Sequence, residues 1–442
     1  MVWSISVAVN TSPCHGEDHG FDPRMLRHIN TDVKNKEATM NQEIIKIDNT
    51  TEEAFQITWD VGRRCNYDCT YCPSHRHDNF SKHASYEKLV HTFDFVKEYF
   101  DTINQYVINE QHLSLSFTGG EPTNNPNLLD LFRHIKKYDK RYSKHVSITS
   151  NGTFSEKYCN ELTDMEIGVT VSYHCEADAK LKSKIVERIY QLSERKYRKP
   201  KINLMFHANE DYFRECVELA NRFLKDGIKF SPRIIGEGGD KFPYAHSYTK
   251  EQHKILKDFW KAKNEAAKGN LSEIKPIEYK AIKDEEVQEE QTNKLWKKDA
   301  DTKAINLGRP CCGGRTFCTK NAGQETDKAT FVPSTRFKGW KCLVNWHWLH
   351  IEQQTDEVYH HQTCQATFNT NRGSIGTIAK SDVILDKLKK QLATGHMPVI
   401  VCSKEVCGCG LCLSKAKNDD DLKDLFSKTV QGLQPLIGEK LY

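Results

Sequence analysis

Between residues 54 and 235, short apolar runs alternate with longer segments whose apolar residues recur at helical spacing. The run from Ala54 to Val61 is partly alternating and predicts a strand. The next segment repeats apolar residues every three or four positions, which is typical of a helix that buries one face: Leu89, Phe93, Val96, Phe100 and Ile103. Further strands are expected near residues 113, 146, 168, 202 and 229. This alternation predicts repeated βα units around a parallel sheet.

Polar motifs follow several of these expected strands at their carboxyl ends. The first strand leads to a loop in which Cys65, Cys69 and Cys72 are spaced C-x3-C-x2-C. Because the carboxyl ends of parallel strands in a barrel converge on one face, the motifs after the next three strands are expected near that loop. These motifs are Gly119-Gly120-Glu121-Pro122, Asn151-Gly152-Thr153 and Ser172-Tyr173-His174-Cys175.

The cysteine spacing indicates an iron-sulfur cluster with one open iron. Three thiolates on one short loop can hold three corners of a cubane, unlike the paired cysteines of a zinc site or the four that close an electron-transfer cluster. With the aromatic Tyr71 before the third cysteine, the loop resembles the signature of the radical S-adenosylmethionine (SAM) superfamily. The glycine and asparagine motifs follow in the order of that family. The alternative is that Cys65, Cys69 and Cys72 are buried thiols or half of a zinc site.

The resemblance implies a fold, two cofactors and a chemistry. The fold is α/β, a partial (βα)6 barrel of the TIM type. A 4Fe-4S cluster on the three cysteines would bind SAM and cleave it to a 5'-deoxyadenosyl radical, which abstracts hydrogen from a substrate. The residues expected to bind SAM are Gly119, Gly120, Glu121, Pro122, Asn151 and Ser172, and a Cβ at either glycine is expected to intrude on it.

Arg233 lies near the end of the last expected strand and has two interpretations. Its planar fork could bind the carboxylate of SAM or of a substrate. Its plain interpretation is a surface ion pair.

Cysteines become dense after a strongly charged segment, residues 268–304, which is predicted as a linker or helical insertion. A hairpin is expected, with strands from Leu343 to Ile351 and from Val358 to Thr363, so that Cys342 and Cys364 meet at its open end. A helix near residues 381–392 follows. The last cysteines are then Cys402, Cys407, Cys409 and Cys412.

This tail resembles the small α+β domain called SPASM, or its shorter form twitch, which follows the barrel in many radical SAM enzymes. The resemblance implies one or two auxiliary 4Fe-4S clusters bound by the hairpin and terminal cysteines. The terminal spacing departs from the family run, so the number of clusters stays open. Zinc sites that include nearby histidines are the alternative. At most one of the further cysteines Cys311, Cys312 and Cys318 is expected to bind iron.

Composition narrows the class of protein. With 442 residues, 38% hydrophobic and 28% charged, the chain is long enough for a barrel and a smaller domain. The predicted divisions are an N-terminal arm (1–51), the barrel (52–267), the charged segment (268–304) and the cysteine-rich domain (305–442). Lys and Arg exceed Asp and Glu by only 64 to 60, so nucleic acid is not expected as a partner. Two basic stretches, 133–144 and 180–201, are predicted to be solvated faces of outer helices.

Sixteen cysteines could also indicate a disulfide-rich secreted protein. The length, the lack of a signal-like or membrane-spanning run and the cluster spacing favour a reducing cytoplasm instead. The expected partners are an electron donor such as flavodoxin or ferredoxin, and a peptide, protein or small-molecule substrate. The contrasting hypothesis is a metal-bound or nucleic-acid-binding module without turnover, which does not explain the motifs at the strand ends.

Overall fold

The computed structural model describes residues 46–47, 54–72, 76–235, 248–267, 275–279, 338–361, 374–402 and 414–437. Their centre is a nine-stranded sheet in the order β11-β10-β9-β2-β3-β4-β5-β6-β7. The six strands from the first part of the chain are β2 (Ala54–Asp60), β3 (His112–Thr118), β4 (His145–Ser150), β5 (Gly168–His174), β6 (Lys201–Phe206) and β7 (Ser231–Ile234). Each is parallel to the next, as the alternating pattern predicts.

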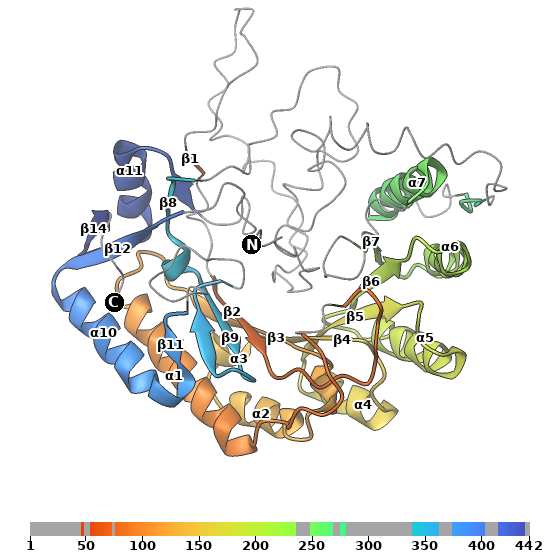
Figure 1. The fold of residues 1–442 in the computed structure, drawn as a ribbon, viewed down its shortest axis with the longest axis horizontal. Helices are drawn as coiled ribbons and strands as arrows, with labels where there is room; N and C mark the ends of the chain where they lie inside the picture. The colour runs from red at the N-terminus through yellow and green to blue at the C-terminus, as the bar shows by residue number, and fades with distance from the viewer. Residues whose placement is uncertain are drawn as a thin grey trace, which may run out of the picture.

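Helices cover one side of this sheet, and together they form an open arc (Figure 1). Hydroxyl, carboxylate or amide side chains cap the first turn of several of them, which fixes where they start: Ser85 on α1, Ser155 on α4, Asp178 on α5 and Asn209 on α6. The helices are α1 (Tyr86–Asn104), α2 (Leu128–Ile135), α3 (Lys140–Ser143), α4 (Glu156–Asp164), α5 (Ala179–Ser193), α6 (Glu210–Lys225) and α7 (Lys250–Ala267). The predicted mixed α/β fold with a parallel sheet is confirmed.

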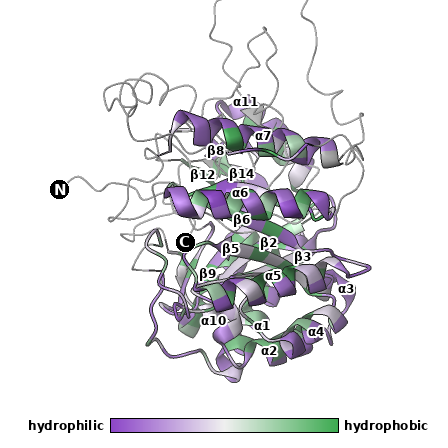
Figure 2. Ribbon diagram, turned by 90° about the vertical axis from the view of Figure 1, so that its right-hand side faces the viewer, coloured by the Kyte–Doolittle hydropathy of each residue, from purple (hydrophilic) through white to green (hydrophobic). Residues whose placement is uncertain are grey.

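The two faces of the sheet differ in chemistry. Phe55, Ile57 and Trp59 of β2 belong to the apolar core, and the ring of Phe55 contacts Tyr99 and Phe100 of α1. Alternate residues on the strands face the other way and are polar although buried, among them Gln56, Thr58, Ser114, Ser116, Ser147, Thr149, Thr170, Ser172 and Asn203. In Figure 2 the outward side of α6 is mostly hydrophilic. The apolar core therefore lies between the helices and the sheet, and the inner face of the arc is polar.

A hairpin is present at the predicted place and extends the same sheet, but its first strand is shorter than predicted: residues 344–346 form a 3-10 turn, and Cys342 lies on β8 (Lys341–Cys342) of a second sheet rather than at the open end of the hairpin. Its strands are β9 (Trp348–Glu352) and β10 (Glu357–Tyr359), joined by a turn at residues 353–356. Strand β9 also pairs in parallel with β2, from Gln56 opposite Trp348 to Asp60 opposite Glu352. The strand β11 (Gly376–Thr377) completes this edge. The strand β2, from which the cysteine loop starts, is therefore paired on both sides.

A second sheet of five strands has the order β1-β13-β8-β12-β14. It contains β1 (Lys46–Ile47), β8 (Lys341–Cys342), β12 (His396–Val401), β13 (Lys415–Ala416) and β14 (Gln434–Ile437). Helices α10 (Ser381–Ala393) and α11 (Asp419–Thr429) accompany it, and α10 confirms the helix predicted after the hairpin. Short 3-10 turns are η2 (Pro122–Asn124), η6 (Val344–Trp346) and η7 (Ile378–Lys380).

The predicted division into domains stays a prediction, because residues 268–274 and 280–304 of the charged segment lie outside the described residues. Two strand pairings cross the predicted boundaries between the domains. The hairpin belongs to the barrel sheet, and the short strand β1, inside the predicted N-terminal arm, pairs with β13. In the part of the chain that the structure describes, no helix has the length and apolarity to cross a membrane.

Candidate active site

The cysteine loop leaves the carboxyl end of β2 and carries Cys65, Cys69 and Cys72, all partly exposed. Its two limbs are joined through Asp78, because Cys65 N donates to Asp78 O at 2.7 Å and Asp78 N donates to Arg63 O at 2.9 Å. Cys72 N donates to Cys69 O at 3.0 Å. The loop is thus held by its own backbone before any metal is considered.

The glycines after β3 pack directly against this loop. Gly120 N donates to Gly62 O at 2.8 Å, and Glu121 N donates to Arg64 O at 2.9 Å. A Cβ on Gly120 would lie 2.2 Å from Arg63 O. One on Gly119, whose φ is +147°, would lie 2.5 Å from Gly62 O. The expected crowding is present, but the first atoms met belong to the backbone of the loop, so these glycines are required for its close approach to β3.

Glu121 and Asn151 come together at the ends of β3 and β4. Glu121 accepts hydrogen bonds from Ser150 Oγ at 2.8 Å and from Asn151 N at 2.7 Å. Burial raises the pKa of Glu121, although these hydrogen bonds oppose the shift. The side-chain amide of Asn151 donates to Asn66 of the loop at 2.8 Å, and Asn66 donates to Thr153 Oγ at 2.9 Å. Pro122 begins the turn η2 behind Glu121. These side chains link the strand ends to the loop.

The middle of the loop is fixed to the ends of β5 and β6. Thr70 N donates to Glu176 Oε2 at 2.8 Å, and the Thr70 hydroxyl donates to Glu176 Oε1. His207 Nε2 lies 3.4 Å from Glu176 Oε1. Because His207 Nδ1 accepts from Asn209 N, Nε2 carries the proton that faces the carboxylate.

The ring of Tyr71 stacks on His174 at 5.8 Å between centroids, and its hydroxyl hydrogen-bonds to His174 Nδ1. Burial lowers the pKa of His174 to about 4, so the ring is neutral near pH 7. Sequence reasoning missed the roles of Asn66, Thr70 and Glu176. Of these three residues, only Glu176 could have been identified from the sequence, because it lies two residues after the end of β5.

The three cysteine side chains of the loop suit an iron-sulfur cluster, whose irons are bound by thiolates. Burial raises the pKa of Cys65 and of Cys72 to about 11, and it raises the pKa of Cys69 as well, so the metal-free loop holds neutral thiols near pH 7. Positive iron would lower these values and release the protons. In the described ranges no three His, Cys, Asp or Glu side chains are arranged around a single metal ion. A cubane instead distributes its ligands over separate irons.

The inner face of the sheet also fits a polar organic cofactor such as SAM. Ser172 Oγ and Ser116 Oγ are buried there without a hydrogen-bond partner. Ser172 lies within β5, which continues to His174 rather than ending at residue 171 as expected. Arg233 on β7 donates from Nε to Asn203 Oδ1 at 3.0 Å, and burial lowers its pKa. No carboxylate of the described residues pairs with Arg233, so the surface ion pair is not found there.

The comparisons with known proteins agree with this geometry. Residues 59–196, which include the cysteine loop and the ends of β2 to β5, match the family described as the radical SAM superfamily. These residues are a radical SAM domain.

Two curated relatives and one solved structure resemble this chain. The chain is 26% identical over 131 residues to "Radical SAM cyclopropyl synthase TigE" of Paramaledivibacter caminithermalis, which covers 28% of each protein. It is 25% identical over 186 residues to "Probable GTP 3',8-cyclase" of Archaeoglobus fulgidus, which covers 40% of this chain and 57% of the relative. The chain thus spans little more than half of these relatives at most.

The solved structure is "Crystal structure of Streptococcus suis SuiB". The two chains share a TM-score of 0.41 and 13% identity, with 79% of this chain and 70% of the other covered.

Outside the radical SAM domain, the second sheet brings Cys342 and Cys402 to neighbouring strands. The register pairs Ile400 of β12 with Cys342 of β8. Just beyond the end of β12, Cys402 N donates to Trp340 O at 2.9 Å and Gly339 N donates to Cys402 O at 2.8 Å. With Gly339 at φ +81°, this is the pattern of a G1 bulge. The two cysteines therefore share one face of the sheet as diagonal neighbours.

The other predicted tail ligands, Cys364, Cys407, Cys409 and Cys412, lie outside the described residues, as do Cys311, Cys312 and Cys318. No disulfide joins two of the described cysteines. Cys159 of α4 and Cys216 of α6 are buried in the apolar core.

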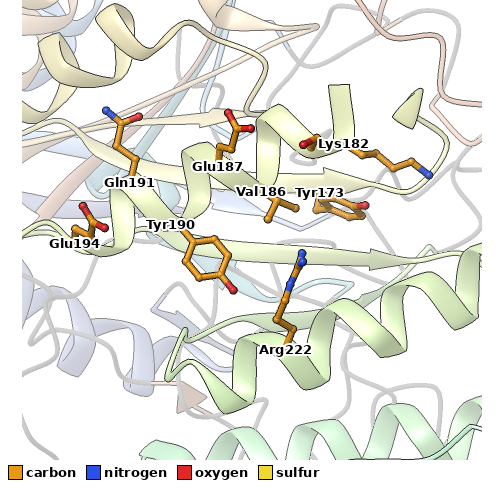
Figure 3. A pocket seen from close by; sticks show the side chains of 9 residues that line it. Tyr173, Lys182, Val186, Glu187, Tyr190, Gln191, Glu194 and Arg222 are labelled. Atoms are coloured by element: carbon orange, nitrogen blue, oxygen red, sulfur yellow. The ribbon is translucent and has the colours of Figure 1, made fainter. Parts of the chain in front are cut away.

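A groove of about 550 Å³ lies away from the cysteine loop, on the helix-covered side of the sheet (Figure 3). Residues of α5 and α6 line it, together with Tyr173 of β5. Lys182 and Tyr173 both donate to the carboxylate of Glu215. None of the predicted site residues lines this groove.

Proposed function

We propose that this protein is a radical SAM enzyme. It cleaves SAM reductively to a 5'-deoxyadenosyl radical, which abstracts a hydrogen atom from a substrate held on the polar inner face of the sheet. The observation that carries the proposal is the position of the cysteine loop at the carboxyl ends of parallel strands, tied to the ends of β3, β4 and β5 by named hydrogen bonds.

The roles of the residues follow from their positions. Cys65, Cys69 and Cys72 would hold the 4Fe-4S cluster, which supplies the electron for SAM cleavage. Gly119 and Gly120 allow β3 to approach the loop, and Glu121 fixes the β4 end. Ser172 and Arg233 offer unused hydrogen-bonding groups on the inner face, which suits the polar groups of SAM or of a substrate. The protein's task is to orient the reactants and exclude water.

We further propose that the tail binds at least one auxiliary 4Fe-4S cluster through Cys342, Cys364, Cys402 and further cysteines among Cys407, Cys409 and Cys412. The shared face of Cys342 and Cys402 supports this arrangement. Such a cluster would accept the electron left on the substrate radical, or anchor the substrate. Zinc in the tail is the competing assignment.

The substrate is not carried over from the relatives, because one is a cyclopropyl synthase and the other a probable GTP cyclase by name, and each match covers only part of the chain. Peptides, protein side chains and small molecules all remain within the proposal. The reaction requires an electron donor, for which flavodoxin or ferredoxin is proposed.

The test is SAM cleavage by anaerobically reconstituted full-length protein. With SAM and dithionite it should release 5'-deoxyadenosine, and replacing Cys65, Cys69 and Cys72 together by Ala should abolish the release. Iron in this variant should fall by about four per chain while the tail keeps its own. A wild-type protein with a full cluster that releases no 5'-deoxyadenosine would contradict the proposal.

Metal analysis separates the two assignments of the tail. Protein made with ample iron should contain about eight irons per chain or more and almost no zinc, because each cubane holds four. About four irons with one or two zincs would instead indicate a radical SAM domain with a zinc-stabilised tail.

A further inference from the structure

The two basic stretches of the sequence, 133–144 and 180–201, meet at the amino ends of the parallel strands. Lys136 and Lys144 come from the first stretch, and Lys136 Nζ donates to a backbone carbonyl just before β4 at 2.8 Å. Arg198 comes from the second stretch and donates to a carbonyl of β4 at 3.3 Å. This end of β4 lies roughly 17 Å from the carboxyl end, where the cysteine loop packs. The basic groups therefore belong to a place separate from the candidate active site.

The positive charges at this end of the sheet are not paired with carboxylates. Among the residues that the structure describes, neither Lys136 nor Lys144 lies within ion-pair distance of an acidic side chain. The hydrogen bonds of the buried Arg195 end on a threonine hydroxyl and two backbone carbonyls, all of them neutral. Glu166 is the acidic residue whose charge acts on Lys136, but it is exposed and forms no ion pair with it. Cations held this close are a cost unless an anion compensates them.

His145, the first residue of β4, adds a buried polar side chain without a hydrogen bond. The residue is 8% exposed, and its ring lies 4.1 Å from that of His112 between centroids. No residue in the described ranges forms a hydrogen bond with either ring nitrogen of His145. Burial, followed by the neighbouring basic groups, lowers the pKa of His145 to about 3, so its ring is neutral near pH 7 and carries one N–H. A buried N–H without an acceptor, among cations, is the complement of an anion.

We propose that the amino ends of β3 and β4 form a binding site for the phosphate group of a phosphorylated small molecule. His145 donates its N–H to a phosphate oxygen, and Lys136 supplies a half-buried ammonium. Lys144 and Arg198 add positive charge around the group. A phosphate suits these residues better than a carboxylate does, because it carries up to two negative charges and three oxygens that accept strong hydrogen bonds. Since the site lies at the other end of the sheet from the cysteine loop, this inference does not depend on SAM cleavage.

The test is equilibrium dialysis of labelled inorganic phosphate and of tripolyphosphate against reconstituted full-length protein at constant ionic strength. One saturable site per chain is expected, and acetate should compete about tenfold or more weakly than phosphate. Lys136→Gln should weaken binding of both probes about tenfold or more, as expected when a hydrogen bond to a charged group is lost. Lys184→Gln removes an exposed lysine of α5 and should bind both probes like the wild type.

Two replacements of His145 separate its N–H from its bulk. His145→Gln keeps an N–H donor at this position and should retain more of the phosphate binding than His145→Leu, which has none. Lys144→Gln changes an exposed residue and should weaken binding by less than about fivefold, so it provides a further variant if a replacement of His145 or Lys136 does not fold. Circular dichroism and iron content show which variants are intact.

A protein that binds neither phosphate nor tripolyphosphate saturably would overturn the inference. So would an intact Lys136→Gln protein that binds both probes as tightly as the wild type, or acetate that competes as well as phosphate. A short single-stranded RNA that binds in a Lys136-dependent way when neither probe does would also overturn it, in favour of a nucleic-acid surface. The release of 5'-deoxyadenosine is measured on the same samples, and it tests the proposed function separately from the phosphate site.

Discussion

Glu176 receives both hydrogen bonds that Thr70 can donate, one from its backbone N–H and one from its hydroxyl. Thr70 stands between the second and third cysteines of the loop, and Glu176 stands just beyond the end of β5. The carboxylate also faces His207 from the end of β6. A single side chain thus fixes the part of the loop that carries Cys69 and Cys72 relative to two strands of the sheet.

Replacing Glu176 by Ala should therefore loosen the loop. The free energy of unfolding of the metal-free protein should fall by about 1.5–3 kcal/mol, because hydrogen bonds to a charged group are lost. Cluster occupancy after reconstitution should fall further than this loss of stability explains, since the three thiols are no longer held in position. Glu187→Ala, an exposed carboxylate on α5, is the matched control. Equal iron content in both variants would contradict a positioning role for Glu176.

The positions of the strands and of the strand-end motifs could be predicted from the sequence, because period-2 runs, helical spacing and glycine-rich ends are local signals. Glu121 and Asn151 are brought together as that pattern predicts. The partners of Thr70 and Asn66 could not be predicted, because they lie 106 and 85 positions away and depend on loop geometry. The pairing of β9 with β2 is equally non-local, since it joins strands separated by about 290 residues.

The glycine motif shows a subtler limit. The sequence indicates that a Cβ at Gly120 is excluded, but it does not say by what, and a cofactor was the expected neighbour. In the structure the neighbour is the backbone of the cysteine loop. The same residue requirement can thus arise from packing within the protein, and only the fold distinguishes the two causes.

Gly120→Ala should lower stability even without SAM or iron. Its Cβ would lie 2.2 Å from Arg63 O and 2.6 Å from Arg64 O, so the loop must move, at a cost of about 1–3 kcal/mol. Gly395→Ala is a useful comparison, because its φ is +76° and no atom lies within 4 Å of the added Cβ. That variant should lose only about 1–2 kcal/mol through backbone strain and should keep its cluster. Urea unfolding of the metal-free proteins and iron analysis of the reconstituted ones give both quantities. If the Gly120→Ala protein were as stable as the wild type but unable to bind SAM, the glycine would be required for contact with the cofactor and not for packing against the loop.

Asp60 should make the stability of the metal-free protein depend on pH. Burial raises the pKa of Asp60 from 3.8 to about 6, partly opposed by His350 and Arg76. The folded chain therefore retains a proton that the unfolded chain has lost, and the contribution of Asp60 to stability falls as pH rises from about 3.8 to about 6. Above that window the ionised carboxylate is a cost.

Asp60→Asn removes this cost and keeps an oxygen for the hydrogen bond that Asp60 Oδ1 accepts from Gly62 N at 3.2 Å. The variant should be more stable than the wild type at pH 7 by at most about 3 kcal/mol, and the difference should vanish near pH 4. Urea unfolding at several pH values measures it, with Asp94→Asn as the exposed control. A wild type that gains stability relative to Asp60→Asn between pH 4 and pH 7 would show that the carboxylate is stabilised rather than penalised.

Gln353 in the hairpin turn should stabilise the strand that precedes the cysteine loop. Its Oε1 accepts from the indole of Trp59 at 2.9 Å and from Thr92 Oγ at 3.2 Å, and its backbone N–H donates to Asp60 O at 2.8 Å. Gln353→Ala leaves the Trp59 N–H buried without an acceptor, which should cost about 1–3 kcal/mol. The adjacent Gln354 is exposed, so Gln354→Ala should change stability by less than about 0.5 kcal/mol.

Trp59→Phe removes the donor, and after that change Gln353→Ala should cost distinctly less, because the two side chains act on the same hydrogen bond. Equal costs of Gln353→Ala in the two backgrounds would mean that the hairpin stabilises β2 through its backbone pairing alone.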